Sequence, residues 1–274
     1  MSKQLKLFVS NIEESTIRPP LRYPGSKYNA LKIIKNFLPE EKIESFCEPF
    51  FGSGAFFFKL INCNESHIND YDHNLINFYK IIKNTKLRKE LIKNVSKFRP
   101  SKKEFNSLRS KKFKNKFDQA CQYFIINRTA YSGIMNRPNW GYHPKKSVQP
   151  LKWGNRIESS GRKLKDAKLT SFDFRLFFKK KLFKKKTFLF IDPPYFKADQ
   201  KRAYFKSFTE EDHMDLSKIL KNLNNKFLLT YDNCREIKKL YAWANVSEVS
   251  WRYHTANSNN TSRKMGNELI IKNY

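Results

Sequence analysis

The pattern of apolar and polar residues predicts that short strands and helices alternate along most of this chain. Short apolar runs bounded by turn residues predict strands, and apolar residues three or four positions apart predict helices. The expected elements are a strand, glycine turn and helix within 43–60, a strand at 67–70, a helix at 75–82, and strands at 168–172, 187–191 and 227–231. Such alternation favours a parallel sheet covered by helices.

The segment between the two strand-rich halves has a different pattern. Residues 84–165 are rich in lysine and show helical periodicity with few strand signals. In this segment, 117–126 can bury one helical face, and 127–142 is expected to be a long polar and aromatic loop. We therefore predict that 1–83 and 166–274 form one α/β domain and that 84–165 is an inserted helical domain.

The C-terminal part adds a capped helix and a hairpin. Thr209 and Asp212 have the spacing of a capping box at the start of a helix. The apolar face expected for that helix consists of Met214, Leu216, Ile219, Leu220 and Leu223. Residues 246–254 and 268–272 are expected to pair as antiparallel strands.

Composition indicates a folded chain with an anionic partner. The 274 residues are 39% hydrophobic and include 25 Phe and 13 Tyr, enough for a sizeable core. Lys and Arg total 55 against 25 Asp and Glu, a formal net charge of +30. This excess favours a nucleic acid partner, although an AT-rich genome would also enrich lysine.

The four cysteines are scattered without metal-ligand spacing, so we expect reduced thiols and no metal site. No apolar run approaches the roughly 18 residues of a membrane span, and the N-terminus lacks the core of a signal peptide. The expected location is cytoplasmic or otherwise intracellular, without secretion and without a membrane partner.

The run from Phe188 to Tyr195 carries the clearest chemical signal. An apolar strand ends there on Asp192, Pro193, Pro194 and Tyr195, and proline cannot continue a sheet ladder. The simpler interpretation is a turn. The alternative is a site, because ligands of open α/β sheets bind beyond the carboxyl ends of the strands. A carboxylate, a fixed carbonyl and an aromatic face suit a planar base with an amino group.

Two further signals fit a nucleoside-containing ligand. Phe50, Gly52 and Gly54 follow the first strand, and glycines there permit close backbone approach to a ligand. Asp70 ends the next strand, where a carboxylate can accept hydrogen bonds from ribose hydroxyls. Asp70 alone would more simply be a turn residue.

The order of these motifs resembles the Dam-like, or D12, class of S-adenosylmethionine-dependent DNA adenine N6-methyltransferases, the alpha group. The motifs are Tyr-Pro-Gly-Ser-Lys27, Glu48-Pro-Phe-Phe-Gly-Ser-Gly54, Ile-Asn-Asp70, Ser171-Phe-Asp173 and Asp192-Pro-Pro-Tyr195. The resemblance covers about nine tenths of the chain, from Leu21 onward. It implies a Rossmann-like methyltransferase sheet in which 84–165 is the target-recognition domain. The first motif departs from the family, which has a second glycine where this chain has Pro24-Gly-Ser.

The resemblance implies roles for individual residues. S-adenosylmethionine would be the methyl donor, with no metal, held by Tyr23, Lys27, Phe50, Gly52, Gly54, Asp70, Asp173 and Asp192. Either Asp173 or Phe172 would border the adenine of this cofactor. Asp192 and Pro193 would accept hydrogen bonds from N6 of the target adenine, and Tyr195 would stack on the base. The adenine must then be flipped out of a DNA duplex or be unpaired.

Candidates for DNA contact come from the expected loop. They are Arg128, Tyr131, Asn136, Arg137 and Trp140, within a stretch that resembles the family's Asn-Arg-x-x-Tyr-x-Gly segment. A loop packed on its own domain is the simpler alternative. We also predict that 196–207 is a mobile loop over the base, and that 257–263 is an ordinary polar hairpin loop although it resembles a family region near DNA.

The predicted function is site-specific DNA adenine N6-methylation, and the resemblance also allows a restriction endonuclease counterpart. Three alternatives stay open at this level. One is methylation of cytosine N4, another is methylation of RNA, and the third is an inactive relative that only binds DNA. Asp rather than Ser or Asn at position 192 disfavours the first, and the motif order disfavours the second.

Overall fold

In the computed structural model, the described residues are 17–198, 200, 207–252 and 265–274. Seven strands form one sheet in the order β3-β2-β1-β4-β5-β7-β6. The strands are β1 Ser45–Glu48, β2 Glu65–Asn69, β3 Lys168–Thr170, β4 Phe188–Ile191, β5 Phe227–Asp232, β6 Asn245–Arg252 and β7 Met265–Lys272. Strands β1 to β5 are parallel, whereas β7 is antiparallel to both β5 and β6. The predicted Rossmann-like sheet with an antiparallel C-terminal hairpin is confirmed.

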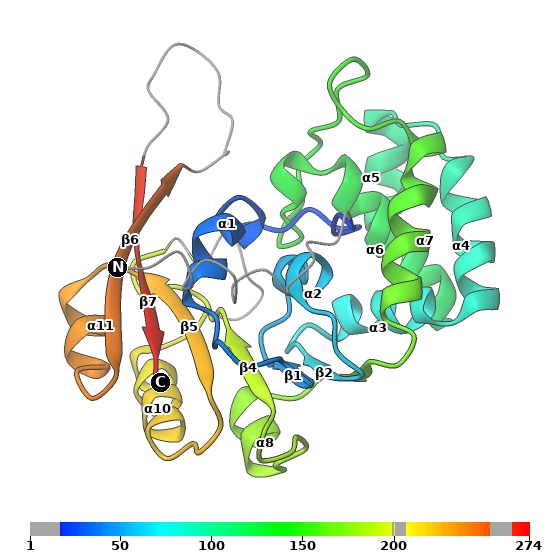
Figure 1. Ribbon diagram of the computed structural model, residues 1–274. Coiled ribbons are helices and arrows are strands. Elements are labelled where there is room, and N and C mark those ends of the chain that lie inside the picture. Colours follow the sequence, from blue (N-terminus) through cyan, green and yellow to red (C-terminus); the bar gives the residue numbers. More distant parts are fainter. Residues whose placement is uncertain (1–16, 199, 201–206, 253–264) are drawn as a thin grey trace, which may run out of the picture.

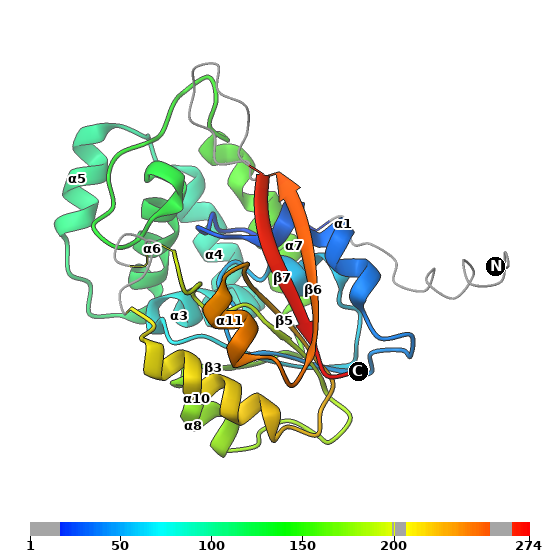
Figure 2. The same ribbon diagram turned by 90° about the vertical axis from the view of Figure 1, so that its left-hand side faces the viewer.

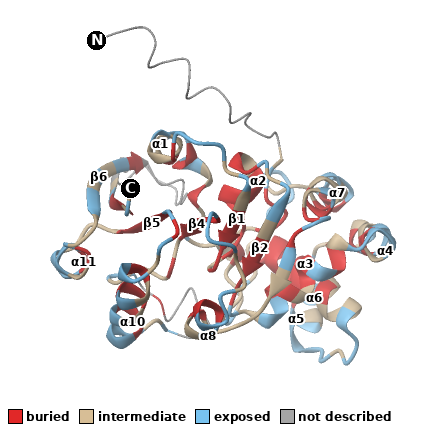
Figure 3. Cartoon of the chain, turned by 60° about the horizontal axis from the view of Figure 1, so that its bottom comes forward, coloured by how far each residue is buried: buried red, intermediate tan, exposed pale blue. Residues whose placement is uncertain are grey.

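The helices cover both faces of this sheet and one of its ends (Figures 1 and 2). They are α1 Leu31–Ile34, α2 Ala55–Leu60, α3 His73–Lys83, α4 Thr85–Ser96, α5 Lys102–Ser110, α6 Lys116–Thr129, α7 Trp153–Lys163, α8 Phe174–Lys179, α10 Glu210–Lys221 and α11 Arg235–Leu240. Figure 3 shows α1 and α2 on one side of the strands and α8 and α10 on the other.

Strand β4 explains why the sheet needs cover on both faces. All four of its residues are buried. Phe188 and Phe190 belong to the hydrophobic cluster that contains α2, whereas Leu189 and Ile191 belong to the cluster that contains α8 and α10. Successive side chains of a strand point to opposite faces, so a continuous apolar run is what a strand between two helical layers requires.

The segment 84–165 is helical, as its pattern indicated, and forms α4 to α7. Leu91, Phe124 and Trp153 from these helices share one hydrophobic cluster with Phe46 of β1. The assignment of 84–165 as a separate domain stays a prediction.

Two details of the sequence analysis were wrong. Helix α6 continues through Thr129, into the expected loop, because its last turn is buried on every side. Met214 is 45% exposed, although it was expected on the apolar face of α10. The capping box of Thr209 and Asp212 is present. In this first turn of α10 the buried residues are Asp212 and His213, not Met214.

The cysteines are all free thiols, and Cys47 is buried. Within the described ranges, no helix has the length and apolar character needed to cross a membrane.

Candidate active site

A cavity of about 530 Å³ opens at the carboxyl ends of β1, β2 and β4. Strand β1 lies between β2 and β4 in the sheet, so the chain changes direction across the sheet at this point, where ligands of such folds bind. Ten of the residues predicted for cofactor and catalysis line the cavity: Tyr23, Lys27, Phe50, Gly52, Asp70, Asp173, Asp192, Pro193, Pro194 and Tyr195. Gly54 lies in the same turn, between two residues that line it.

Asp192 directly follows β4 and is held by two partners. Lys27 Nζ lies 2.8 Å from Oδ1 and 3.0 Å from Oδ2 of Asp192. The Thr230 hydroxyl, on the neighbouring strand β5, donates to Asp192 Oδ1 at 2.6 Å. Lys27 and Thr230 are buried, while the Asp192 side chain keeps 19% exposure toward the cavity. The carboxylate is therefore fixed in place and still reachable.

Tyr195 is held by one contact over the face of its ring and another at its hydroxyl. Lys27 Nζ lies 4.5 Å from the ring centroid, a cation–π arrangement, and the hydroxyl donates to Glu268 Oε2 on β7. The backbone after Tyr195 is held by Asp232, whose carboxylate accepts from Phe196 N at 2.9 Å and Lys197 N at 2.7 Å. The predicted mobile loop at 196–207 continues from here, and most of it lies outside the described residues, as does 257–263.

The glycine turn after β1 has the backbone that its glycines permit. Gly52 and Gly54 have φ of 49° and 66°, which disfavour other residues. A Cβ on Gly54 would lie 2.2 Å from the Phe51 ring. Gly52 N donates to Asp70 Oδ2 at 2.8 Å, so the turn is joined to the carboxylate at the end of β2.

Asp70 lines the cavity, and both of its carboxylate oxygens accept backbone hydrogen bonds. Its second oxygen accepts from Asp72 N at 2.9 Å. Burial raises the pKa of Asp70 to about 7, although the hydrogen bonds from Asp72 and Gly52 oppose this shift.

Glu48 is a cavity residue that the sequence analysis did not select. It ends β1, is 2% exposed, and its Oε2 has no hydrogen-bond partner among the described residues. Burial, with the charge of Asp192, raises the pKa of Glu48 well above its ordinary value. A buried unpaired acceptor in a cavity fits a ligand that brings a donor or a positive charge. The available signal was an acid at the end of a strand, directly before the glycine turn.

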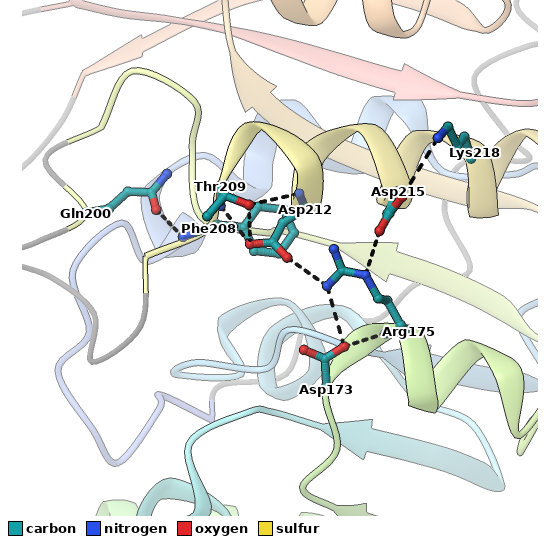
Figure 4. Close-up of polar contacts among 8 residues, drawn as sticks. All are labelled: Asp173, Arg175, Gln200, Phe208, Thr209, Asp212, Asp215 and Lys218. Carbon is teal, nitrogen blue, oxygen red and sulfur yellow. Dashed lines mark hydrogen bonds and ion pairs between the residues drawn. The ribbon is translucent and has the colours of Figure 1, made fainter.

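Asp173 borders the cavity but also serves the fold (Figure 4). It caps α8 by accepting from Arg175 N at 3.0 Å. The Arg175 side chain pairs with Asp212 and Asp215, at 2.7 Å from each, and its Nη1 lies 3.8 Å from Asp173 Oδ1. Phe174 packs beside it against Phe208 and Phe50, so this end of the cavity is aromatic.

The predicted DNA-contact residues do not line the cavity. Arg137 is exposed, Tyr131 and Asn136 are half-buried, and Trp140 packs against Phe105. Gly133 and Met135 from the same loop do reach the cavity.

Arg128 is buried, which does not suit direct contact with base edges. It is 6% exposed, and its Nε has no hydrogen-bond partner among the described residues. Burial, together with the positive charges of Arg156 and Arg22, lowers the pKa of Arg128 to about 9. The positive charges of Arg22 and Arg156 thus act on Arg128 from two other segments of the chain.

Asn127 joins this region to the N-terminal segment. Its side chain accepts from Arg22 N at 2.8 Å and donates to Arg22 O at 2.7 Å and Gly133 O at 3.2 Å. The polar pattern of 127–142 predicted a loop at Asn127, but this residue is fully buried in α6 and bridges two segments.

A Rossmann-like sheet that presents an Asp-Pro-Pro-Tyr turn to a glycine-lined cavity defines an amino-group methyltransferase. The model of the D12 class N6 adenine-specific DNA methyltransferases matches residues 23–255, so the chain belongs to that family. It is a DNA adenine methyltransferase.

Three curated relatives are similar along nearly their whole length. The Type II methyltransferase M.MjaIII of Methanocaldococcus jannaschii is 28% identical, covering 94% of this chain and 99% of the relative. M.CviBI of Paramecium bursaria Chlorella virus NC1A is 27% identical, covering 94% of this chain and 100% of the relative. M1.LlaDCHI of Lactococcus lactis subsp. cremoris is 28% identical over 94% and 96%. Among solved structures, an rRNA methyltransferase of Streptomyces viridochromogenes covers 92% of this chain and 86% of its own at 12% identity, with a TM-score of 0.42.

Proposed function

We propose that this enzyme transfers the methyl group of S-adenosylmethionine to N6 of an adenine flipped out of a specific DNA sequence, as the methylating member of a Type II system. The observation that carries the proposal is the Asp192 carboxylate, held by Lys27 and Thr230 and kept accessible at the cavity. Tyr195 beside it offers the aromatic face on which a base would stack.

The chemistry explains why Asp192 and Pro193 are the residues required. An exocyclic amine is a poor nucleophile because its lone pair is delocalised into the purine ring. Hydrogen bonds from N6 to the Asp192 carboxylate and the Pro193 carbonyl would favour a tetrahedral nitrogen with a free lone pair. The N6 lone pair would then form a bond to the methyl carbon as the bond from that carbon to sulfur breaks, with its electron pair passing to sulfur to leave S-adenosylhomocysteine. Positive charge would develop on N6 until one N6 proton leaves to water. The carboxylate stabilises that charge, and positioning supplies much of the rest.

The cavity residues fit the cofactor. Gly52 and Gly54 allow backbone to approach the methionine part, Asp70 can accept from the ribose hydroxyls, and the unpaired Glu48 oxygen can accept from the cofactor's ammonium group. When bound, S-adenosylmethionine supplies an electrophilic methyl group on a sulfonium. The Lys27 ammonium lines the cavity and also holds the Asp192 carboxylate, so it would lie beside both the cofactor and the catalytic group.

Cofactor affinity is expected to increase as the pH rises from 6 to 8. With a pKa of about 7, Asp70 is mostly protonated at pH 6 and mostly ionised at pH 8, and the ionised form accepts from ribose hydroxyls. If only the ionised form binds, the dissociation constant should fall about tenfold over this range. Isothermal titration calorimetry with S-adenosylmethionine measures this dissociation constant. The Asp70→Asn control should bind the cofactor more weakly, with an affinity that changes less with pH. A pH-independent constant in the wild type contradicts this role.

DNA affinity is expected to depend on Arg128 and on the half-buried Arg22 and Arg156 near it. We assign Arg128, with Arg22 and Arg156, to a DNA phosphate rather than to a base edge. Arg128→Met should weaken DNA binding by about 1–3 kcal/mol and reduce the slope of log affinity against log salt by about one. Titration of a labelled duplex at several salt concentrations measures both.

Arg162→Ala is the matched control for this prediction. It removes the same charge from an exposed arginine on α7 that is paired with Glu158. If the two variants lose the same DNA affinity, the effect of Arg128 comes from net charge alone and not from its position. An unchanged affinity in Arg128→Met would remove the phosphate assignment.

Site specificity is tested by expressing the protein in a host that lacks adenine methylation and sequencing its DNA with a method that detects modified bases. N6-methyladenine confined to one short motif is the expected result. Methylation scattered without a motif, or absent from DNA, would contradict the proposal.

A further inference from the structure

Glu268 is a buried acid whose position the fold alone does not explain. It lies on β7, opposite Asp232 of β5 and Val249 of β6, and is 1% exposed. Oε2 accepts from the Tyr195 hydroxyl, but Oε1 has no hydrogen-bond partner among the described residues. A half-satisfied buried carboxylate costs folding free energy, so a neutral residue would serve the sheet better.

The contacts of Glu268 lead directly to the catalytic carboxylate. The Tyr195 hydroxyl donates to Glu268, and Lys27 forms an ion pair with Asp192. Thr230 also donates to Asp192. Lys27 lies over the face of the Tyr195 ring. The ring is thus held at its hydroxyl by Glu268 and over its face by a cation.

We propose that Glu268 is a positioning residue for methyl transfer, which fixes the position of the Tyr195 ring and thereby that of the adenine that stacks on it. This inference rests on the proposed function. The ring of Tyr195 can swing about its Cα–Cβ bond, and a hydrogen bond at the far end of the ring restricts that swing most effectively. A reacting nitrogen must be aligned closely with the methyl carbon, so a small displacement of the base has a large effect on rate.

The charges around Glu268 predict a pH signature for this role. Burial, followed by the negative charges of Asp192 and Asp232, raises the pKa of Glu268 to about 7, whereas Lys27 and the bond from Tyr195 oppose this shift. Below this pKa the carboxyl is neutral, and its hydrogen bond with Tyr195 loses the assistance of charge. The single-turnover rate should therefore fall as the pH decreases through about 7.

The test is a double-mutant cycle of Glu268→Ala and Tyr195→Phe, measured as single-turnover methyl transfer to DNA at saturating cofactor. Each variant should lower the rate by roughly 10- to 100-fold with an unchanged cofactor dissociation constant, and the double variant should be no slower than the slower single one. Glu268→Gln keeps an acceptor without a titrating group, so it should recover most of the rate and lose the decline below pH 7. Its thermal unfolding midpoint should equal or exceed that of the wild type.

Several outcomes would overturn the inference. The effects of the two substitutions on rate could be independent of each other. Glu268→Gln could be as slow as Glu268→Ala, or the loss of rate in each variant could parallel its loss of stability. A wild type without methyl transfer would contradict the proposed function instead. In that case the same double-mutant cycle can be measured as free energy of unfolding. If the two substitutions then show no interaction energy, Glu268 does not hold Tyr195 and the inference is overturned by that result alone.

Discussion

Asp192→Asn is expected to lower methyl transfer by roughly 10³-fold or more while the protein stays folded and binds cofactor. Asparagine has nearly the same shape and can still accept one hydrogen bond, but it lacks the negative charge that stabilises positive charge developing on N6. Loss of a single preorganised electrostatic group in an active site costs about 10²–10³-fold. The Asp192 carboxylate also aligns the N6 nitrogen, so we expect a loss of rate at the upper end of this range or beyond it. Single-turnover transfer of a labelled methyl group measures the effect.

Asparagine is a better choice than alanine for this experiment. Asp192→Ala should also abolish transfer, but it would remove both acceptor oxygens from Lys27 and Thr230, whereas asparagine keeps one. Either substitution takes the counter-charge away from the buried ammonium of Lys27, and losing one partner of a buried pair costs about 3–5 kcal/mol of stability. The cofactor dissociation constant and the unfolding midpoint serve as controls for Asp192→Asn. Transfer at the wild-type rate would remove Asp192 from the mechanism.

Lys27→Met is expected to impair both stability and catalysis. Lys27 is 5% exposed and bridges both Asp192 oxygens and the Tyr195 ring. Methionine fills a similar volume but leaves Asp192 without a counter-charge, which should cost about 3–5 kcal/mol in free energy of unfolding. The rate should fall by about 10²-fold or more, because Asp192 and Tyr195 lose their common contact. Chemical denaturation and single-turnover assays measure the two effects.

Two comparisons identify the cause of the Lys27 effect. Lys32→Met changes an exposed lysine nearby and should alter neither stability nor rate. The double variant Lys27→Met with Asp192→Asn should recover stability without recovering activity, since it removes the unpaired charge. Lys27→Met with wild-type stability, or a double variant less stable than either single one, would mean that the ion pair is not what holds this site.

The sequence predicted those parts of the fold and site that depend on local pattern. The strand that ends at Asp192 and the turn at Gly52–Gly54 could be predicted because apolar runs, prolines and glycines act on their immediate neighbours. The capping box at Thr209 could be predicted for the same reason. Three partners of the turn after β4 could not, because Thr230, Asp232 and Glu268 are brought there by sheet pairing.

Arg128 shows the other limit of sequence pattern. An arginine in an expected polar loop was a reasonable candidate for contact with bases. The burial of Arg128, and the charges of Arg22 and Arg156 that act on it, depend on how the N-terminal segment crosses α6 and α7, which no local pattern indicates. Asn127 was missed for the same reason, since its partners Arg22 and Gly133 come from two separate segments.

The most direct test of the central claim is incubation of the purified protein with labelled S-adenosylmethionine and unmethylated genomic DNA, followed by nucleoside analysis. Total RNA and the Asp192→Asn variant serve as parallel controls. We predict label in N6-methyl-2′-deoxyadenosine, with none in methylcytosine or RNA nucleosides, and loss of nearly all label with the variant. Label in another nucleoside, or equal label with Asp192→Asn, would contradict the account.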